Sequence, residues 1–379
     1  MGSRSMDTPR KILIFYASAG HGHEKAARAV LEATQKKYPA AQSRAVDVIS
    51  LMPAYFGHIY RQSYILQITH TPWLWGIFYY AVDVPWIYFF MRFVRRLMNS
   101  MVSKKFVKLV LDEKPDVIFS THFFSTEVVS HMKGDGLTPA KLITIVTDYL
   151  PHYVWTAKNV DRYAVGLPET KQGLLQRGVA GDKIEITGIP VEEKFFKPVS
   201  RPAILKTLDL GDGAFTVLLT SGGIGVAAVE PLIKKLSEMK EPLQMILVCG
   251  SNRLLYEKMN STKALYPNLR VLGFVNNMNE LMEISDVVVG KAGGLTITES
   301  FLKNKPVILV GSIPGQEARN VICVKAHGAG LEAKNSGEVA AIILRLAGAP
   351  DELSQLKKGT ASIARPDAAE KIAFLAQSE

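Results

Sequence analysis

The chain has 379 residues and a mass of 41.7 kDa, which is enough for two domains of ordinary size. Hydrophobic residues make up 47% and charged residues 21% of the chain, a composition that excludes intrinsic disorder, collagen-like repeats and a coiled coil. Two cysteines are too few for a disulfide framework and indicate a reducing cytoplasm, while the net charge of +10 indicates an anionic partner, either nucleic acid or an acidic membrane surface.

The first half of the chain opens with a strand, a glycine-rich turn and a helix. Residues 11–18 form a short apolar run rich in β-branched and aromatic side chains, and residues 24–38 carry apolar side chains at helical spacing. This order is typical of the first half of a βαβ unit. Further strands are predicted over residues 45–48, 117–120, 142–147 and 163–165, and helices over residues 104–111 and 124–132.

The turn after the first predicted strand contains Gly20, His21, Gly22 and His23. Glycines let a ligand approach the backbone and leave the N–H groups of a helix N-terminus available. A histidine at this place can take a proton from a hydroxyl, because its pKa is close to neutral. A capping or surface histidine is an equally good interpretation of the turn alone, and a dinucleotide site is poorly supported because the full G-x-G-x-x-G pattern is missing.

The pattern of strands and helices restarts in the second half. Strands are predicted over residues 215–220, 245–249, 269–272, 287–289 and 307–310, with a helix over residues 228–239 and helical patterns between the later strands. Alternation in both halves predicts an α/β protein of two Rossmann-like, doubly wound domains around one cleft. We expect a first domain at residues 8–196, a linker at 191–202, a second domain at 203–361, and a last helix at 367–377 that could return to the first domain.

Three motifs of the second half follow predicted strands. Ser221, Gly222 and Gly223 open a glycine-rich segment that could face a phosphate, although a structural turn is nearly as good an interpretation. Gly293 and Gly294 lead into a helix N-terminus suited to a diphosphate, and one turn later Glu299 can accept hydrogen bonds from a ribose or serve only as a helix acid.

The third motif, residues 314–320, contains neighbouring glutamine and glutamate side chains, Gln316 and Glu317. Together they can bind sugar hydroxyls. The motif is weak alone, since any loop could contain these two residue types.

An aromatic and basic segment interrupts the first half. Nine aromatic residues lie within positions 73–90, and residues 92–108 carry six Lys or Arg and no acid. Such a segment favours an anionic lipid surface. The alternatives are a buried helix pair with a solvated basic face and, less favoured, a site for single-stranded nucleic acid. The charge and the Gly and Pro of residues 73–91 argue against a transmembrane helix.

Together these motifs resemble glycosyltransferase family 28, with its two-domain GT-B fold, and in particular its processive diacylglycerol glucosyltransferases and monogalactosyldiacylglycerol synthases. The residues that carry the resemblance are SAGHGH (18–23), TDY (147–149) with Trp155, TGIPV (187–191), GFVNNMNELM (273–282), KAGGLTITE (291–299) and PGQEARN (314–320), in this order along nearly the whole chain.

The resemblance implies a role for each matching residue. His23 is the expected catalytic base, with a possible share for His21. The expected donor-binding residues are Gly22, Ser221, Gly222, Gly223, Phe274, Val275, Lys291, Gly293, Gly294, Leu295, Thr296, Glu299, Gln316, Glu317 and Asn320. Within this set, the backbone of Phe274 and Val275 is expected to contact uracil, and Gln316 with Glu317 the hexose. The expected acceptor- and membrane-binding residues are Trp73, Trp75, Trp86, Phe89, Phe90, Arg92, Arg95, Arg96, Asp148 and Trp155.

The expected enzyme is an inverting lipid glycosyltransferase that moves a hexose from a UDP-sugar to the 3-hydroxyl of 1,2-diacylglycerol, with glucose favoured over galactose. It would need no cofactor and no metal, bind anionic lipids but not nucleic acid, and lie at the cytoplasmic face of the cell membrane as a peripheral protein. The alternatives are a UDP-galactose-dependent monogalactosyldiacylglycerol synthase, an undecaprenyl-linked muramyl-peptide N-acetylglucosamine transferase, a UDP-sugar epimerase and, least favoured, a non-catalytic membrane-binding protein.

Overall fold

The computed structural model describes residues 10–18, 20–53, 55–56, 71–221, 226–238 and 243–377. It divides into two compact units, and each is described by itself. Unit 1 comprises residues 1–193, 313–316 and 365–379, and unit 2 comprises residues 194–312 and 317–364. The predicted loop residues Gly222 and Gly223 lie outside the described residues.

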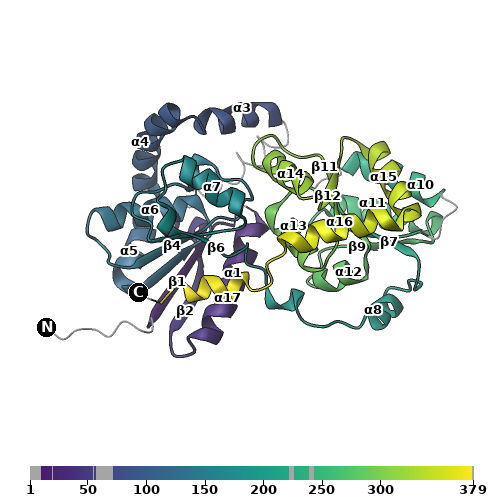
Figure 1. Cartoon of the computed structure of the whole chain (residues 1–379), viewed down its shortest axis with the longest axis horizontal. Coiled ribbons are helices and arrows are strands. Elements are labelled where there is room, and N and C mark those ends of the chain that lie inside the picture. The colour runs from purple at the N-terminus through teal and green to yellow at the C-terminus, as the bar shows by residue number, and fades with distance from the viewer. Residues whose placement is uncertain are drawn as a thin grey trace. The chain divides into compact units, whose positions relative to one another are not determined.

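Unit 1 is built on a parallel sheet (Figure 1). The sheet has six strands in the order β2-β1-β3-β4-β5-β6. Its strands are β1 (Lys11–Tyr16), β2 (Gln42–Asp47), β3 (Val117–Ser120), β4 (Lys141–Ile145), β5 (Arg162–Val165) and β6 (Ile184–Ile186). Its helices are α1 (His21–Lys37), α3 (Pro72–Val82), α4 (Pro85–Val102), α5 (Lys104–Glu113), α6 (Phe123–Gly134), α7 (Pro168–Gln176) and α17 (Ala368–Phe374). The winding direction reverses between β1 and β3, which is where doubly wound folds bind their ligands.

Strand β1 shows why the sheet is covered on both faces. Successive side chains of a strand point to opposite faces, so Ile12 and Ile14 pack into one hydrophobic core and Leu13 and Phe15 into another. A parallel sheet buried in this way produces the continuous apolar run seen in the sequence. The C-terminal helix α17 completes one of these cores beside α1 (Figure 1), through Ile372.

Unit 2 has its own six-stranded parallel sheet, with the strand order β12-β11-β10-β7-β8-β9. Its strands are β7 (Phe215–Thr220), β8 (Leu243–Val248), β9 (Leu269–Leu272), β10 (Val287–Gly290), β11 (Val307–Val310) and β12 (Gly330–Ala333). Its helices are α8 (Arg201–Thr207), α10 (Val226–Ser237), α11 (Arg253–Thr262), α12 (Met278–Ile284), α13 (Gly294–Leu302), α14 (Gln316–Ala326, whose first residue groups with unit 1), α15 (Ser336–Gly348) and α16 (Pro350–Ile363). This is the dinucleotide-fold strand order, with its switch point between β7 and β10.

Helices α3 and α4 form an angular pair at the periphery of unit 1 (Figure 1). No single helix among the described residues is both long and apolar enough to cross a membrane, and α3 and α4 meet that criterion only as a pair bent by 97°. Most of their large side chains point outward, so the interpretation of residues 73–90 as a buried pair does not describe this structure.

Candidate functional site

His23 stands in the first turn of α1, at the switch point of the first sheet. The Asp47 carboxylate holds Ser18 after β1, because it accepts hydrogen bonds from the backbone N–H of Ser18 (3.1 Å) and from its hydroxyl (2.6 Å). Gly20 then caps the helix in an extended conformation, and α1 begins at His21, three residues before the predicted start. The His21 side chain is exposed and His23 is half-buried.

The hydrogen bonds of His23 decide which ring nitrogen carries its proton. Its Nδ1 lies 2.6 Å from the carbonyl oxygen of Thr121, which can only accept, so Nδ1 carries the proton and Nε2 keeps its lone pair. The Thr121 hydroxyl in turn donates to the His23 carbonyl at 3.0 Å, and the Thr147 hydroxyl lies 3.4 Å from Nδ1. Burial lowers the pKa of His23 to about 4, so the ring is neutral at physiological pH.

A second imidazole, His122, packs edge-on against His23 with ring centroids 4.8 Å apart. Its Nδ1 accepts a hydrogen bond from the backbone N–H of Phe124 at 3.2 Å and so caps α6. Burial, and then the neighbouring His23 and Arg95, hold the pKa of His122 well below its usual value. His122 is therefore also neutral, and it supplies a rigid wall rather than a charge.

Trp155 completes the surroundings of His23, with ring centroids 6.4 Å apart. The Trp155 indole N–H donates to the Asp148 carboxylate at 2.8 Å, so the two residues predicted on the acceptor side act as one buried pair. Gln316, predicted to bind the hexose, groups with unit 1, where its amide also hydrogen-bonds to Asp148. Thr121, His122 and the Thr147 side chain were not predicted as functional residues.

Arg95 was predicted to be one of the membrane-facing cations, but it does not lie on the surface with them. Its guanidinium forms an ion pair with Glu127 of α6, and the amide of Asn99 donates to the same carboxylate oxygen at 3.1 Å. The Arg95 side chain is only 17% exposed, whereas that of Arg96 is 58% exposed. Arg95 therefore ties α4 to α6, because a buried guanidinium requires a carboxylate partner.

The outer face of α3 and α4 carries the predicted aromatic side chains. Trp73, Trp86, Phe89 and Phe90 are exposed, with Phe89 at 78%, while Trp75 is half-buried. Further apolar side chains extend this face along the two helices: Ile77, Phe78, Tyr80, Phe93, Leu97, Met98 and Met101. We name this set, with the four exposed residues above, the α3–α4 apolar face. Exposed apolar patches of this extent mark protein or membrane contacts.

In unit 2, the predicted donor-binding residues gather at the carboxyl ends of the strands. The Ser221 hydroxyl, after β7, donates to the carbonyl of Cys249 at 3.0 Å. Phe274 follows β9 and is exposed, with the neighbouring Val275 half-buried. After β10, Gly293 caps α13, so the N–H groups at Gly294, Leu295 and Thr296 begin a helix and have no carbonyl one turn earlier within it.

The segment after β11 packs against this turn. The Asn320 amide donates to the carbonyl of Ala292 at 2.9 Å, and Lys291 pairs with the Glu317 carboxylate at 3.3 Å. Glu299, farther along α13, is 1% exposed. Unit 2 thus has a helix N-terminus suited to an anion, with one carboxylate buried farther along the same helix and another paired to Lys291, just before that helix. The described residues include no cluster of three or more His, Cys, Asp or Glu that could bind a metal.

Family profiles match most of the chain. The profile described as monogalactosyldiacylglycerol (MGDG) synthase matches residues 23–191, and that of the glycosyltransferase family 28 C-terminal domain matches residues 216–360. The chain belongs to glycosyltransferase family 28. It is therefore an enzyme of the glycosyltransferase class, as the sequence motifs predicted.

A curated relative extends the similarity to almost the full length. The processive diacylglycerol beta-glucosyltransferase of Bacillus licheniformis is 28% identical over 97% of this chain and 94% of its own. Both units of this family member therefore have counterparts in that relative.

Solved structures agree on the fold. Acinetobacter baumannii MurG superimposes with a TM-score of 0.63 at 14% identity, covering 97% of this chain and 99% of its own. A UDP-N-acetylglucosamine 2-epimerase has a TM-score of 0.60 at 14% identity, covering 96% and 94%. The predicted GT-B fold is confirmed, but the fold alone does not separate a transferase from an epimerase.

Proposed function

We propose that this protein transfers a hexose from a UDP-sugar to the 3-hydroxyl of 1,2-diacylglycerol, with inversion at the anomeric carbon and with glucose as the favoured sugar. The observation that carries the proposal is the protonation of His23. Its imidazole is neutral, and its Nδ1–H donates a hydrogen bond to the Thr121 carbonyl, so Nε2 can accept a proton. The named activity of the full-length relative supplies the acceptor and the sugar.

In the proposed reaction, Nε2 of His23 removes the proton of the acceptor hydroxyl as its oxygen attacks the anomeric carbon. The bond from that carbon to the UDP oxygen breaks, and UDP leaves as an anion. The N-terminus of α13 stabilises this charge through its N–H groups and the helix dipole. These steps need neither a cofactor nor a metal, and the α-linked donor gives a β-glycoside.

We further propose that the α3–α4 apolar face binds the cytoplasmic face of the membrane. The cations nearest this face in the sequence are the exposed Arg96, Lys104, Lys105 and Lys108 and the half-buried Arg92. Aromatic side chains favour the lipid–water boundary, and each cation near an anionic surface contributes about 1 kcal/mol. This arrangement supports a lipid surface rather than nucleic acid as the anionic partner.

A transfer assay tests the proposed function. We expect label from UDP-[¹⁴C]glucose to move into a lipid product when the protein is incubated with diacylglycerol, as resolved by thin-layer chromatography. Label from UDP-[¹⁴C]galactose alone would identify a monogalactosyldiacylglycerol synthase. Transfer from UDP-N-acetylglucosamine to an undecaprenyl-linked muramyl peptide, or epimerisation without an acceptor, would replace the proposal by one of those two activities, and no turnover at all would contradict it.

Salt and charge test the membrane proposal. We expect co-sedimentation with phosphatidylglycerol vesicles to weaken as salt rises, since exposed charges are screened over about 8–10 Å. The variant Arg92→Glu/Arg96→Glu/Lys104→Glu should lose most of this binding. Arg95 is left intact because a glutamate there would meet Glu127.

The control variant is Lys206→Glu/Lys234→Glu/Lys235→Glu, which makes the same charge change on exposed lysines of unit 2. It should sediment as the unaltered protein does. Equal binding by both variants would show that the α3–α4 cations do not anchor the protein.

A further inference from the structure

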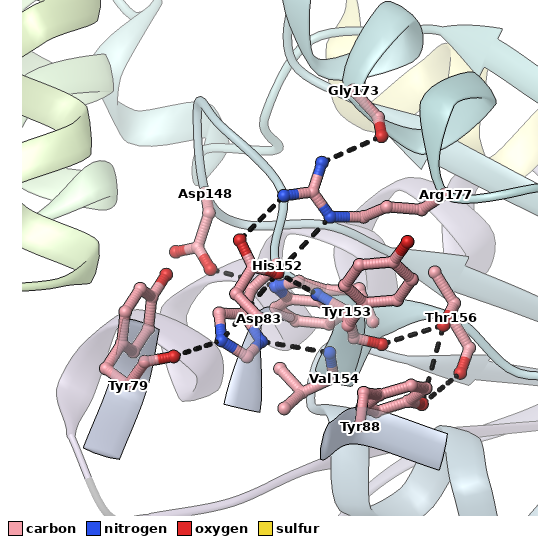
Figure 2. A network of polar contacts seen from close by, with 11 residues as sticks. Tyr79, Asp83, Tyr88, Asp148, His152, Tyr153, Val154, Thr156, Gly173 and Arg177 are labelled. Atoms are coloured by element: carbon pink, nitrogen blue, oxygen red, sulfur yellow. Dashed lines mark hydrogen bonds and ion pairs between the residues drawn. The ribbon is translucent and has the colours of Figure 1, made fainter. Parts of the chain in front are cut away.

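The bend between α3 and α4 contains a buried carboxylate, Asp83, which lies between the two helices in the sequence. Its side chain is only 8% exposed. Oδ1 accepts a hydrogen bond from the backbone N–H of Tyr153 at 2.8 Å, and Oδ2 accepts one from the Arg177 guanidinium at 2.7 Å (Figure 2). Arg177 Nε lies a further 3.3 Å from Oδ1, so the fork of the guanidinium spans both oxygens.

Arg177, at the end of α7, is itself held in place. Its Nη1 donates to the Gly173 carbonyl at 3.0 Å, and the guanidinium lies 5.1 Å from the centroid of the Tyr153 ring. The bend of the helix pair is thus attached to a helix that borders the main sheet, because Asp83 and Arg177 are both too buried to remain unpaired.

His152 adds a second attachment from the same loop. Its Nε2 lies 2.8 Å from the carbonyl oxygen of Tyr79 in α3, and its Nδ1 accepts from the backbone N–H of Val154 at 3.0 Å (Figure 2). The Tyr79 carbonyl can only accept, so Nε2 carries the proton. The ring therefore links α3 to the loop in one fixed orientation.

Helix α4 provides the third attachment, through Tyr88. Unlike its neighbours Phe89 and Phe90, Tyr88 is buried, and its hydroxyl donates to the Thr156 carbonyl at 2.9 Å. Its ring stacks on Tyr153 with centroids 5.1 Å apart. Both helices that carry the α3–α4 apolar face are therefore bound to one short loop, residues 152–156.

That loop leads directly to the catalytic side of unit 1. Trp155 lies within it, bonded to Asp148 at 2.8 Å and 6.4 Å from the His23 ring. Tyr153, two residues before Trp155, donates its backbone N–H to Asp83, and its ring contacts Arg177 and Tyr88. The loop of residues 152–156 thus connects helices α3 and α4 to the surroundings of His23, the proposed base.

We propose that Asp83 is a positioning residue that holds the α3–α4 pair in register with Trp155 and Asp148, so that an acceptor entering from a bilayer arrives beside His23. The inference rests on the proposed function and deepens it. A lipid in a bilayer is constrained by where the apolar face sits, whereas a short-chain acceptor dissolved in water is not. Asp83 is therefore required for the first kind of acceptor and dispensable for the second.

The variant Asp83→Asn tests this role, because it turns one carboxylate oxygen into an N–H group that meets the Arg177 guanidinium. With dioleoylglycerol in phosphatidylglycerol vesicles, we expect the transfer rate to fall about 10–100-fold, the scale expected for a misplaced substrate. With dihexanoylglycerol dispersed as monomers, the rate should stay within about threefold of the unaltered protein. Vesicle co-sedimentation and calorimetric affinity for UDP should not change.

Asp161→Asn is the matched control. Like Asp83, Asp161 accepts hydrogen bonds from a basic side chain and a backbone N–H, here those of Lys133 and Leu142, but it has no part in the network of Figure 2. Asp161→Asn should leave the ratio of the vesicle rate to the dihexanoylglycerol rate unchanged. Arg177→Lys keeps the positive charge but removes the forked guanidinium. It should lower the vesicle rate relative to the dihexanoylglycerol rate as Asp83→Asn does, and it tests the proposal if Asp83→Asn does not fold.

Parallel loss with both acceptors would overturn the proposal, since it would indicate general damage to the site. Retention of the vesicle rate, or loss of vesicle binding itself, would also overturn it. Failure of the unaltered protein to glycosylate either diacylglycerol would instead reject the proposed function, so the two failures are distinguishable.

Discussion

Replacement of His23 by alanine should lower the rate of hexose transfer by about 10²–10⁴-fold, the usual effect of losing a general base. The expectation follows from the lone pair on Nε2, which the hydrogen bond between Nδ1 and Thr121 leaves available. UDP affinity should be nearly unchanged, because the residues proposed to contact the uracil and the ribose, and the helix N-terminus proposed for the diphosphate, lie in unit 2. The measurement is steady-state transfer to diacylglycerol together with calorimetric titration by UDP.

The exposed His21 provides the control for this prediction, since it stands two residues away in the same helical turn. His21→Ala should keep most of the activity. Normal turnover by His23→Ala together with a large loss in His21→Ala would reassign the base to His21.

The pH profile provides a second measurement on His23. Because burial lowers the pKa of its imidazole to about 4, Nε2 remains unprotonated well below the ordinary value of 6.5. The acid limb of kcat/KM, which reports the free enzyme, should therefore lie near pH 4. A limb near pH 6.5 would contradict this assignment.

Unfolding must be followed at each pH of that profile. The His23 ring binds its proton more readily in the unfolded chain, so this residue also makes the folded state less stable as the pH falls from 6.5 towards 4. Activity lost while the protein remains folded then reports the base itself.

The strands of both sheets were largely predictable, because a parallel sheet buried on both faces leaves continuous apolar runs such as residues 11–16 and 215–220. The edge strands β6 and β12 were not predicted. Their sequences, IEI and GLEA, are short and each contains a glutamate, so neither forms the continuous apolar run seen in β1 and β7. The strand orders also differ between the two units, and no local pattern in the sequence encodes which strands become neighbours.

Because local sequence patterns do not show which strands become neighbours, site residues from distant parts of the chain were missed. Thr121 lies 98 positions from His23, and only the pairing of β1 with β3 brings its carbonyl to the imidazole. The loop motif around His23 was visible because its residues are contiguous. The tautomer of His23 was not visible in the sequence, because the distant Thr121 carbonyl determines it.

The sequence of helix α4 contains a periodic pattern that could have identified Arg95 as a buried residue. Tyr88, Arg92, Arg95 and Asn99 recur at intervals of three or four residues, which is the period of one helix face. Within this stripe, Tyr88 and Arg95 contact the rest of unit 1, through Thr156 and Glu127. Composition alone grouped Arg95 with the surface cations, whereas helical periodicity separates it from the exposed Arg96 beside it in the sequence.

Loss of the Glu299 carboxylate should weaken UDP and UDP-glucose alike, by about 1.5–3 kcal/mol if a charged hydrogen bond to the ribose is removed. Glu299 is buried in α13, the helix whose N-terminus is proposed to bind the diphosphate. Calorimetric titration of Glu299→Ala with both ligands measures the effect. Glu299→Gln, which keeps the shape of the side chain, should weaken both ligands too, and it separates the lost charge from a cavity in the helix.

Glu317→Ala and Gln316→Ala should behave differently, because the proposed partner of both side chains is the hexose. Each should leave the affinity for UDP nearly unchanged and weaken UDP-glucose binding or its transfer. Glu317 is the sharper comparison, since it is a carboxylate of the same unit whose partner Lys291 follows β10, the strand that precedes α13. If Glu317→Ala loses as much UDP affinity as Glu299→Ala, the residues after β11 contact the nucleotide, and the hexose must be assigned to another loop.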